Sequence, residues 1–263
     1  MELTWSLVPL CVAALLAGAI NAMAGGGTVL TFPALLGALA GMPGAMAAVI
    51  ANGTSTVALV PGSLAGAWGY RRQAADMRRW LLLLAAPSVL GGALGALLVT
   101  RLDPAYFKHL VPWLLLTAAL LFLKESLWPR SHEIRARDEK LSPRATLGLI
   151  GVQFLVSVYG GYFGAGIGIL MLASLGAMRL GDIYRINALK NLLACGINGV
   201  STAVFIVEGK VAWRLALPMA LSAIIGGYLG ALLSLKVRPR YVRWLVVIIG
   251  LGLAAYYFVV GIG

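Results

Sequence analysis

Long apolar stretches, separated by short charged or Pro/Gly-rich breaks, divide the chain into ten segments. A helix needs about 20 apolar residues to cross a hydrocarbon core of about 30 Å, and most of the segments approach that length. The pattern predicts helices over residues 5–24, 28–40, 44–70, 80–99, 106–123, 145–160, 164–178, 183–207, 213–235 and 241–260. Because 28–40 and 164–178 are too short to span comfortably, we expect half-helices or re-entrant segments there.

The composition points to the same class of protein. Of the 263 residues, 60% are hydrophobic and 11% are charged, and the mean hydropathy is +0.91. A soluble domain carries about 25% charged residues because its surface faces water, so a soluble fold is excluded. The sequence therefore predicts an all-α polytopic membrane protein whose first partner is the lipid bilayer.

The basic residues indicate how the segments are oriented. A net charge of +12 could suggest a nucleic-acid partner. However, Lys and Arg cluster in short loops beside the apolar segments, as topology signals do, and we reject nucleic-acid binding. If the loop at 71–79 is cytoplasmic, 16 of the 21 Lys and Arg residues lie on the cytoplasmic side and 4 on the external side. This bias predicts that both termini are external.

An internal duplication organises the chain. Residues 91–98 match residues 226–233 at seven of eight positions, an offset of 135. The same offset pairs Asn52 with Asn187 and Pro104 with Pro239. Chance similarity between apolar runs does not explain such a set of matches. The chain therefore contains one unit twice.

The duplication also predicts the domain organisation. We expect a first transmembrane repeat at 1–123, a cytoplasmic linker at 124–144 and a second repeat at 145–263. Five segments in each half give the second repeat the opposite orientation, and the loop charges agree with this inversion. Two inverted-topology repeats around a site near the midplane are typical of secondary transporters that work by alternating access.

Each half contains a glycine-rich break before its short segment. Glycines at such a break leave the first backbone N–H groups and the positive end of the helix dipole open to an anion. Close helix packing is the alternative, because small residues also allow it. The glycine breaks are Gly25, Gly26 and Gly27 before Thr28, and, at an offset of 140, Gly164, Gly166 and Gly168. For four glycines in the middle of full-length segments we prefer packing: Gly91, Gly95, Gly226 and Gly230.

Polar residues form one stripe along the third segment of each half. On a helix of 100° per residue, the residues of each stripe lie within about 60° of its first asparagine, Asn52 or Asn187. Two equivalent stripes could line a central cavity, or could hydrogen-bond between helices and only hold the bundle together. The second-half stripe is Asn187, Lys190, Asn191, Asn198 and Ser201, and the first-half stripe is Asn52, Ser55, Thr56 and Ser63.

Lys190 is the only basic residue well inside a segment. An ammonium at bilayer depth costs about 2.5 to 3.5 kcal/mol on insertion scales, so it usually has a function or a partner. The alternative is snorkelling toward the cytoplasmic end, about two turns away. Its counterpart in the first half is Ser55, so the two half-sites would be chemically unequal.

The segments hold almost no Asp, Glu or His. A proton relay through the membrane needs such groups, and so does a hydrolytic or metal site. His109 and His132 lie at a segment end and in a loop. We therefore expect neither an enzyme nor a cofactor or metal.

The chain also resembles a known family, the TauE/SafE family of sulfite and organosulfonate exporters. The family-like residues are the run Asn21–Pro33, which includes the three glycines, and the stretch Asn52–Thr56. The resemblance covers essentially the whole chain. It departs from the pattern in the second half, where Ala173 stands at the position of Pro33. The short motifs mark the family better than the substrate.

The resemblance implies export of small anions, sulfite or organosulfonates, across the inner (plasma) membrane of a bacterium. Two alternatives remain open: a gated anion channel, and a membrane scaffold that transports nothing. A homodimer is also left open. The candidate substrate-binding residues are Asn21, Gly25, Gly26, Gly27, Thr28, Asn52, Ser55, Thr56, Gly164, Gly166, Gly168, Asn187, Lys190, Asn191 and Asn198.

Overall fold

The computed structural model describes residues 2–23, 25–69, 77–127, 142–177, 183–233 and 239–262. These residues form ten helices and no strand. The helices are α1 (Glu2–Met23), α2 (Thr28–Ala38), α3 (Gly44–Gly69), α5 (Arg78–Arg101), α6 (Pro104–Leu127), α7 (Pro143–Tyr162), α8 (Ile167–Ala177), α9 (Ile183–Val207), α10 (Trp213–Leu233) and α11 (Pro239–Val259).

Each apolar segment predicted from the sequence is a helix, and the ends differ by a few residues. The two short segments are helices of 11 residues each, α2 and α8. In the second of them the helix begins at Ile167, so Gly164 and Gly166 lie in the turn before it. Within the described ranges, seven helices are long and apolar enough to cross a membrane: α3, α5, α6, α7, α9, α10 and α11. The chain is an all-α polytopic membrane protein.

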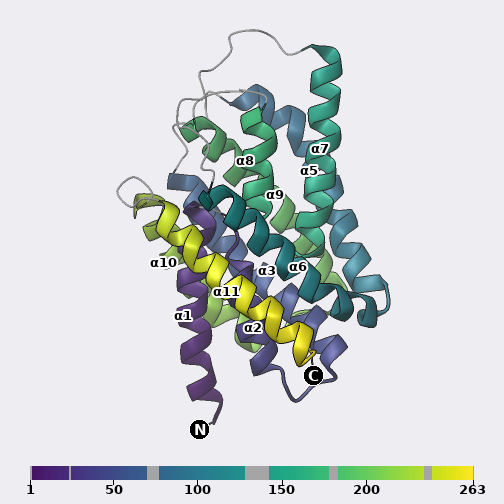
Figure 1. Cartoon of the computed structure of the whole chain (residues 1–263), viewed down its shortest axis with the longest axis vertical. Coiled ribbons are helices and arrows are strands. Elements are labelled where there is room, and N and C mark those ends of the chain that lie inside the picture. The colour runs from purple at the N-terminus through teal and green to yellow at the C-terminus, as the bar shows by residue number, and fades with distance from the viewer. Residues whose placement is uncertain are drawn as a thin grey trace.

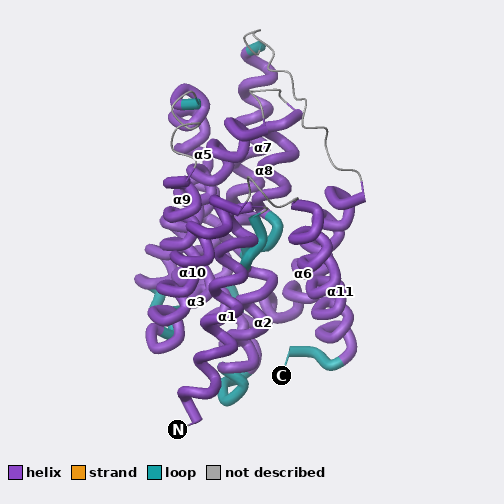
Figure 2. Tube along the Cα trace, turned by 90° about the vertical axis from the view of Figure 1, so that its left-hand side faces the viewer, coloured by secondary structure: helices purple, strands orange, loops and turns teal. Residues whose placement is uncertain are grey.

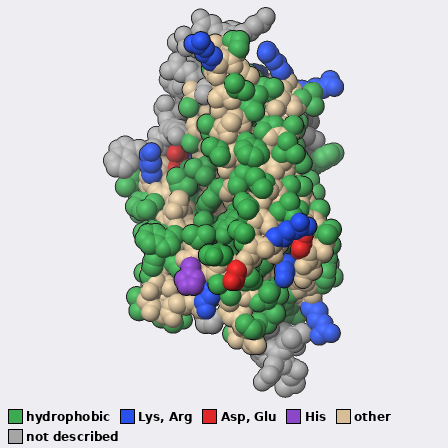
Figure 3. All heavy atoms as spheres, turned by 90° about the vertical axis from the view of Figure 1, so that its right-hand side faces the viewer, with side chains coloured by type: hydrophobic (Ala, Val, Ile, Leu, Met, Phe, Trp, Pro, Cys, Tyr) green, Lys and Arg blue, Asp and Glu red, His purple; other side chains and the backbone are tan. Residues whose placement is uncertain are grey.

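The surface agrees with a lipid environment. Figure 3 shows hydrophobic side chains over most of one face, with basic side chains at its upper end and in its lower third. Large apolar residues such as Leu82, Leu155 and Ile248 are about two-thirds exposed. Most of the predicted linker lies outside the described residues, as do the basic loops at 70–76, 178–182 and 234–238. The first residues of that linker, Lys124–Leu127, instead complete α6.

The two halves run in opposite directions along the molecule. α1 starts at the lower end of Figure 1 and rises, and α2 then lies in the lower half. α7 starts at the upper end and descends, and α8 lies in the upper half. The short helix of each half therefore turns back toward the end from which its half began.

The fourth helix of each half packs against the other half. α10 lies against α1 and α3, and α5 lies against α7 and α9. The pairs α3 with α9 and α6 with α11 join equivalent helices, and Figure 2 shows α6 and α11 side by side on one flank. Exchanging the two halves leaves these pairs unchanged, so each half is completed by a helix of the other. The contact of α3 with α6 has no equally extensive counterpart between α9 and α11.

Glycines make these cross-half contacts close. A Cβ added to Gly91 would meet the carbonyl oxygen of Phe154, and one added to Gly226 would meet that of Leu15. Gly95 and Gly230 repeat the arrangement against Val158 and Ala19. The predicted packing role of these four glycines is confirmed. The equivalent partners in α1 and α7 lie 139 residues apart, one fewer than the offset of 140 inferred from the glycine breaks, where several glycines allow either alignment.

Candidate functional site

The two glycine breaks are tight turns that only glycine adopts readily. Gly25 and Gly26 have φ of 70° and 154°, and Gly164 and Gly166 have φ of 78° and 76°. Side chains disfavour positive φ because Cβ then crowds the backbone. The turns let α1 and α7 end inside the protein and the short helices α2 and α8 begin there.

The two turns lie directly against each other. A Cβ added to Gly25 would lie 2.6 Å from the Cα of Gly168, and one added to Gly26 would lie 3.5 Å from the nitrogen of Gly166. The N-terminal ends of α2 and α8 therefore meet in the interior. Because each end carries about half a positive charge from its helix dipole, this region favours an anion.

The turns also use some of the N–H groups that the sequence analysis expected to be open. Val29 donates its N–H to the carbonyl of Gly26 at 3.1 Å, and Ile167 donates to Gly164 at 3.3 Å. For these groups the expectation is wrong, because a tight turn supplies acceptors three residues back. The helix ends therefore attract an anion chiefly through the electric field of their dipoles.

Asn21 holds the first turn in place. Its side-chain Nδ2 donates to the hydroxyl of Ser63 on α3 at 2.7 Å, and its Oδ1 accepts from the N–H of Gly26 at 3.2 Å. One amide thus connects the end of α1, the glycine turn and α3. The carboxamide suits this position because it offers a donor and an acceptor at once.

A small cavity opens beside the paired turns. Its volume is about 10 Å³, which is room for about one water molecule. Both halves contribute to its wall, and the polar part of that wall is Asn21, Ser63, Lys190 and Asn191. The remaining lining residues are Ala22, Gly25, Ile167, Gly168 and Ala194.

Among the residues that the structure describes, Lys190 is the one charged residue in this wall. The side chain is 1% exposed, and its Nζ has no hydrogen-bond partner among the residues that the structure describes. The Nδ2 of Asn191 also lacks a partner. Snorkelling does not describe this lysine, because its side chain ends in the interior rather than at the membrane surface. An unpaired buried ammonium is costly, and a bound anion would offset that cost.

The first-half stripe is used mainly for hydrogen bonds between helices. The amide of Asn52 donates to the carbonyl of Tyr162 at 2.9 Å, and Ser55 shares a hydrogen bond of 2.5 Å with Thr31. Thr56 bonds back to the carbonyl of Asn52 at 2.9 Å. For Asn52 and Ser55 the structure favours the bundle-holding alternative, whereas the bond of Thr56 lies within α3. Ser63 is the stripe member that reaches the cavity.

The structure therefore brings together a subset of the candidate residues. Five of them line the cavity: Asn21, Gly25, Gly168, Lys190 and Asn191. The cavity wall does not include Gly26, Gly27, Thr28, Asn52, Ser55, Thr56, Gly164, Gly166, Asn187 or Asn198. Sequence reasoning missed the apolar lining residues Ala22, Ile167 and Ala194, since it relied on polarity. Only the helical spacing of Ala194, one turn after Lys190, could have indicated it.

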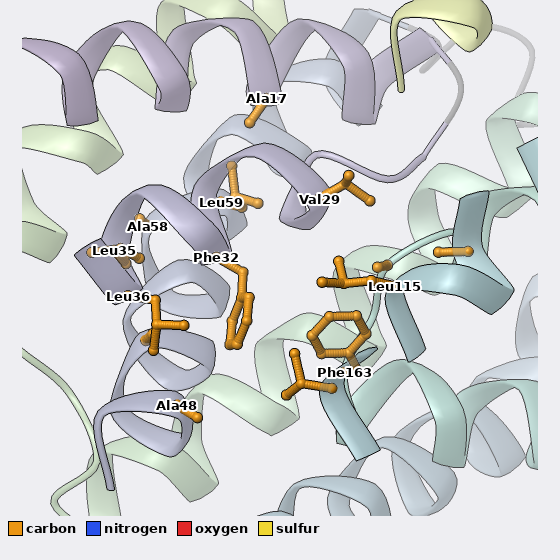
Figure 4. Packing of buried hydrophobic residues seen from close by; sticks show 14 of the residues in the cluster. Ala17, Val29, Phe32, Leu35, Leu36, Ala48, Ala58, Leu59, Leu115 and Phe163 are labelled. Carbon is orange, nitrogen blue, oxygen red and sulfur yellow. The ribbon is translucent and has the colours of Figure 1, made fainter. Parts of the chain in front are cut away.

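An aromatic cluster lies beside the glycine turns, where α6 begins. The ring of Phe32 on α2 makes edge contacts with Phe107 at 6.3 Å and with Phe163 at 5.4 Å, and Phe107 contacts Tyr162 at 5.4 Å. Figure 4 shows Phe32 and Phe163 facing each other between their helices. Packed aromatic rings of this kind exclude water. The cluster seals one side of the interior.

This chain is similar to known proteins over almost its whole length. Residues 10–257 match the family described as Sulfite exporter TauE/SafE. A probable membrane transporter protein of Haemophilus influenzae is 32% identical over 238 residues, which cover 90% of this chain and 88% of that protein. Probable membrane transporter protein ORF9 of a Sinorhizobium species is 29% identical, with 93% and 89% covered. Probable membrane transporter protein YfcA of Escherichia coli K12 is 28% identical, with 92% and 86% covered. The chain belongs to the sulfite exporter TauE/SafE family of membrane transporters.

Proposed function

We propose that the protein exports small anions, such as sulfite or organosulfonates, across the bacterial inner membrane by alternating access. The observation that carries this proposal is the unpartnered Nζ of Lys190 in a cavity shared by both halves. The meeting helix ends add positive potential at the same place. The name of the family supports the class of anion.

Within this proposal the chain is two inverted repeats, 1–123 and 145–263, joined by a cytoplasmic linker at 124–144. The opposite directions of α1 and α7 support the inversion. The exchanged fourth helices support it too, because α10 packs on α1 and α3 as α5 packs on α7 and α9. Both termini lie outside the cell in this arrangement, as the distribution of Lys and Arg favours.

The cavity residues would make different contacts with a bound anion. Lys190 supplies positive charge, while Asn191, Asn21 and Ser63 supply hydrogen bonds to an oxyanion. Gly25 and Gly168 let the anion approach the backbone because no side chain shields it. A cavity of about 10 Å³ is too small for a sulfonate. The halves must therefore move apart to admit the substrate, as alternating access requires.

The membrane potential can drive such export without a coupling ion. An inside-negative potential favours exit of an anion by about 2.3 kcal/mol per charge per 100 mV. This corresponds to about a fiftyfold concentration ratio at equilibrium. Among the described membrane-spanning helices, the cavity wall contains no Asp, Glu or His to relay a proton.

Efflux from proteoliposomes tests the proposal. Methanesulfonate is a suitable substrate because its single charge does not change with pH near neutrality. We expect efflux to accelerate when an inside-negative potential is imposed, and to be unaffected by a pH gradient at zero potential. Efflux that ignores the potential and follows the pH gradient would refute potential-driven export. A single-channel conductance far above carrier turnover would refute alternating access.

A further inference from the structure

One ion pair joins the last helices of the two halves. Arg243, one turn into α11, lies with its Nη1 3.4 Å from the Oε1 of Glu125 in the last turn of α6. The same Nη1 donates to the backbone carbonyl of Glu125 at 3.3 Å. Both side chains are largely buried, with exposed fractions of 15% and 12%. Pairs this sheltered are screened less by salt than surface pairs, and removing one partner leaves the other charge buried and unpaired.

Arg243 has more hydrogen-bonding capacity than Glu125 uses. Its Nε is buried and has no partner among the described residues. A guanidinium carries five N–H donors arranged to hold a planar oxyanion with two bonds at once. The pair also lies near the glycine turn that borders the cavity, because a Cβ added to Gly26 would meet the ring of Phe122, about one turn before Glu125 on α6. The ion pair therefore lies about one helical turn from a side chain that packs on this turn.

The equivalent place at the other end of the molecule is open. At the offset of 135, Arg243 corresponds to Lys108, and Glu125 corresponds to Val260. Lys108 and Val260 both line a pocket of about 430 Å³. One end of the molecule has the buried ion pair of Glu125 and Arg243. The other end has Lys108, Val260 and the pocket that both residues line. The two ends differ both in the acid and in the cation, and only the end with the acid has its two helices joined by this ion pair.

We propose that the Glu125–Arg243 pair is a latch across the anion path, and that Arg243, once released from Glu125, is the first cation an entering anion binds on its way to Lys190. The inference rests on the proposed function. An oxyanion replaces the carboxylate of Glu125 on the guanidinium, so Arg243 remains paired while α6 and α11 separate. The anion then moves to the second cation, at the cavity.

Cysteine labelling tests the latch without any transported substrate. Ala194 lines the cavity and tolerates a small change, so Ala194→Cys is made in a chain with Cys11→Ala and Cys195→Ala. Inside-out vesicles are treated with an anionic methanethiosulfonate reagent (MTSES) or a cationic one (MTSET). Glu125→Gln removes the acid and preserves its shape. Glu208→Gln is the matched control, because it breaks the exposed pair of Glu208 with Arg101.

With Glu125→Gln we expect MTSES to label Cys at position 194 about tenfold faster or more, since one partner of a sheltered pair is gone. Glu208→Gln should label at the parent rate. Arg243→Gln also opens the latch, and the preference for MTSES over MTSET should disappear with it. Unchanged labelling in inserted Glu125→Gln protein would overturn the latch, and a persistent anion preference in Arg243→Gln would overturn the role of Arg243. Either result leaves anion efflux by the parent protein unaffected, so it is distinguishable from failure of the proposed function.

Discussion

Replacing Lys190 with methionine is expected to reduce anion efflux about a hundredfold or more while the protein remains folded and inserted. Among the described residues the ammonium is the only charge in the cavity wall, and truncating one partner of a buried charge pair costs about 2 to 5 kcal/mol. In the empty protein, by contrast, the Nζ of Lys190 has no hydrogen-bond partner in the part of the chain that the structure describes. Methionine fills a similar volume without that desolvation cost, so we expect equal or higher thermal stability.

The matched control is Lys210→Met. Lys210 follows α9 and places its Nζ 3.6 Å from the sulfur of Met46, away from the cavity. Methanesulfonate efflux and the melting temperature in detergent are measured for both variants. Normal efflux by inserted Lys190→Met protein would show that the cavity is not the binding site. A large fall in the melting temperature would show that Lys190 has a structural partner instead.

Gly25→Ala is expected to destabilise the protein by about 2 to 5 kcal/mol. At φ of 70° an alanine costs about 1 to 2 kcal/mol. Its Cβ would also lie 2.6 Å from the Cα of Gly168, and backbone on both sides leaves little room to relax. Such crowding typically costs about 1 to 3 kcal/mol more. Thermal melting of the purified protein should show a midpoint about 4 to 20 °C lower.

The control for Gly25→Ala is Gly199→Ala, a substitution of a glycine within α9. A Cβ there would meet nothing within 4 Å, and alanine is the better helix former by about 1 kcal/mol. We expect this variant to melt at the parent temperature or slightly above it. If the Gly25→Ala variant has the same melting temperature as the Gly199→Ala variant, the two glycine turns are not in close contact.

The helices could be predicted from the sequence because the bilayer sets their length and composition. Apolar runs had to be helices, and the short ones could not span. The glycine breaks and Lys190 also stood out, since each is unusual at its position. These signals are local, so a single sequence contains them.

The division of the polar stripes could not be predicted in the same way. Asn52 is bonded to the carbonyl of Tyr162, 110 residues away in the sequence. Its counterpart in the other half, Asn187, is not in the cavity wall, whereas Asn191, one turn later, is. Which stripe residue finds a neighbouring helix depends on how the two halves pack, and a repeat of similar residues does not determine that.

The Glu125–Arg243 ion pair could not be predicted from the sequence for a related reason. Both residues lie at helix ends rich in charge, where Lys and Arg indicate topology. Their contact joins positions 118 residues apart, and it depends on α6 lying along α11. The exchanged packing of α5 and α10 is likewise a tertiary property that periodicity does not express.

The most direct test of the anion site is a crystal structure of the protein crystallised in the presence of selenite, whose selenium scatters anomalously and whose shape and charge resemble those of sulfite. We predict an anomalous peak between the two halves, with a selenite oxygen about 2.8 Å from the Nζ of Lys190 and within hydrogen-bonding reach of Asn191. A peak found only elsewhere, with the Lys190 cavity empty at saturating selenite, would contradict the account.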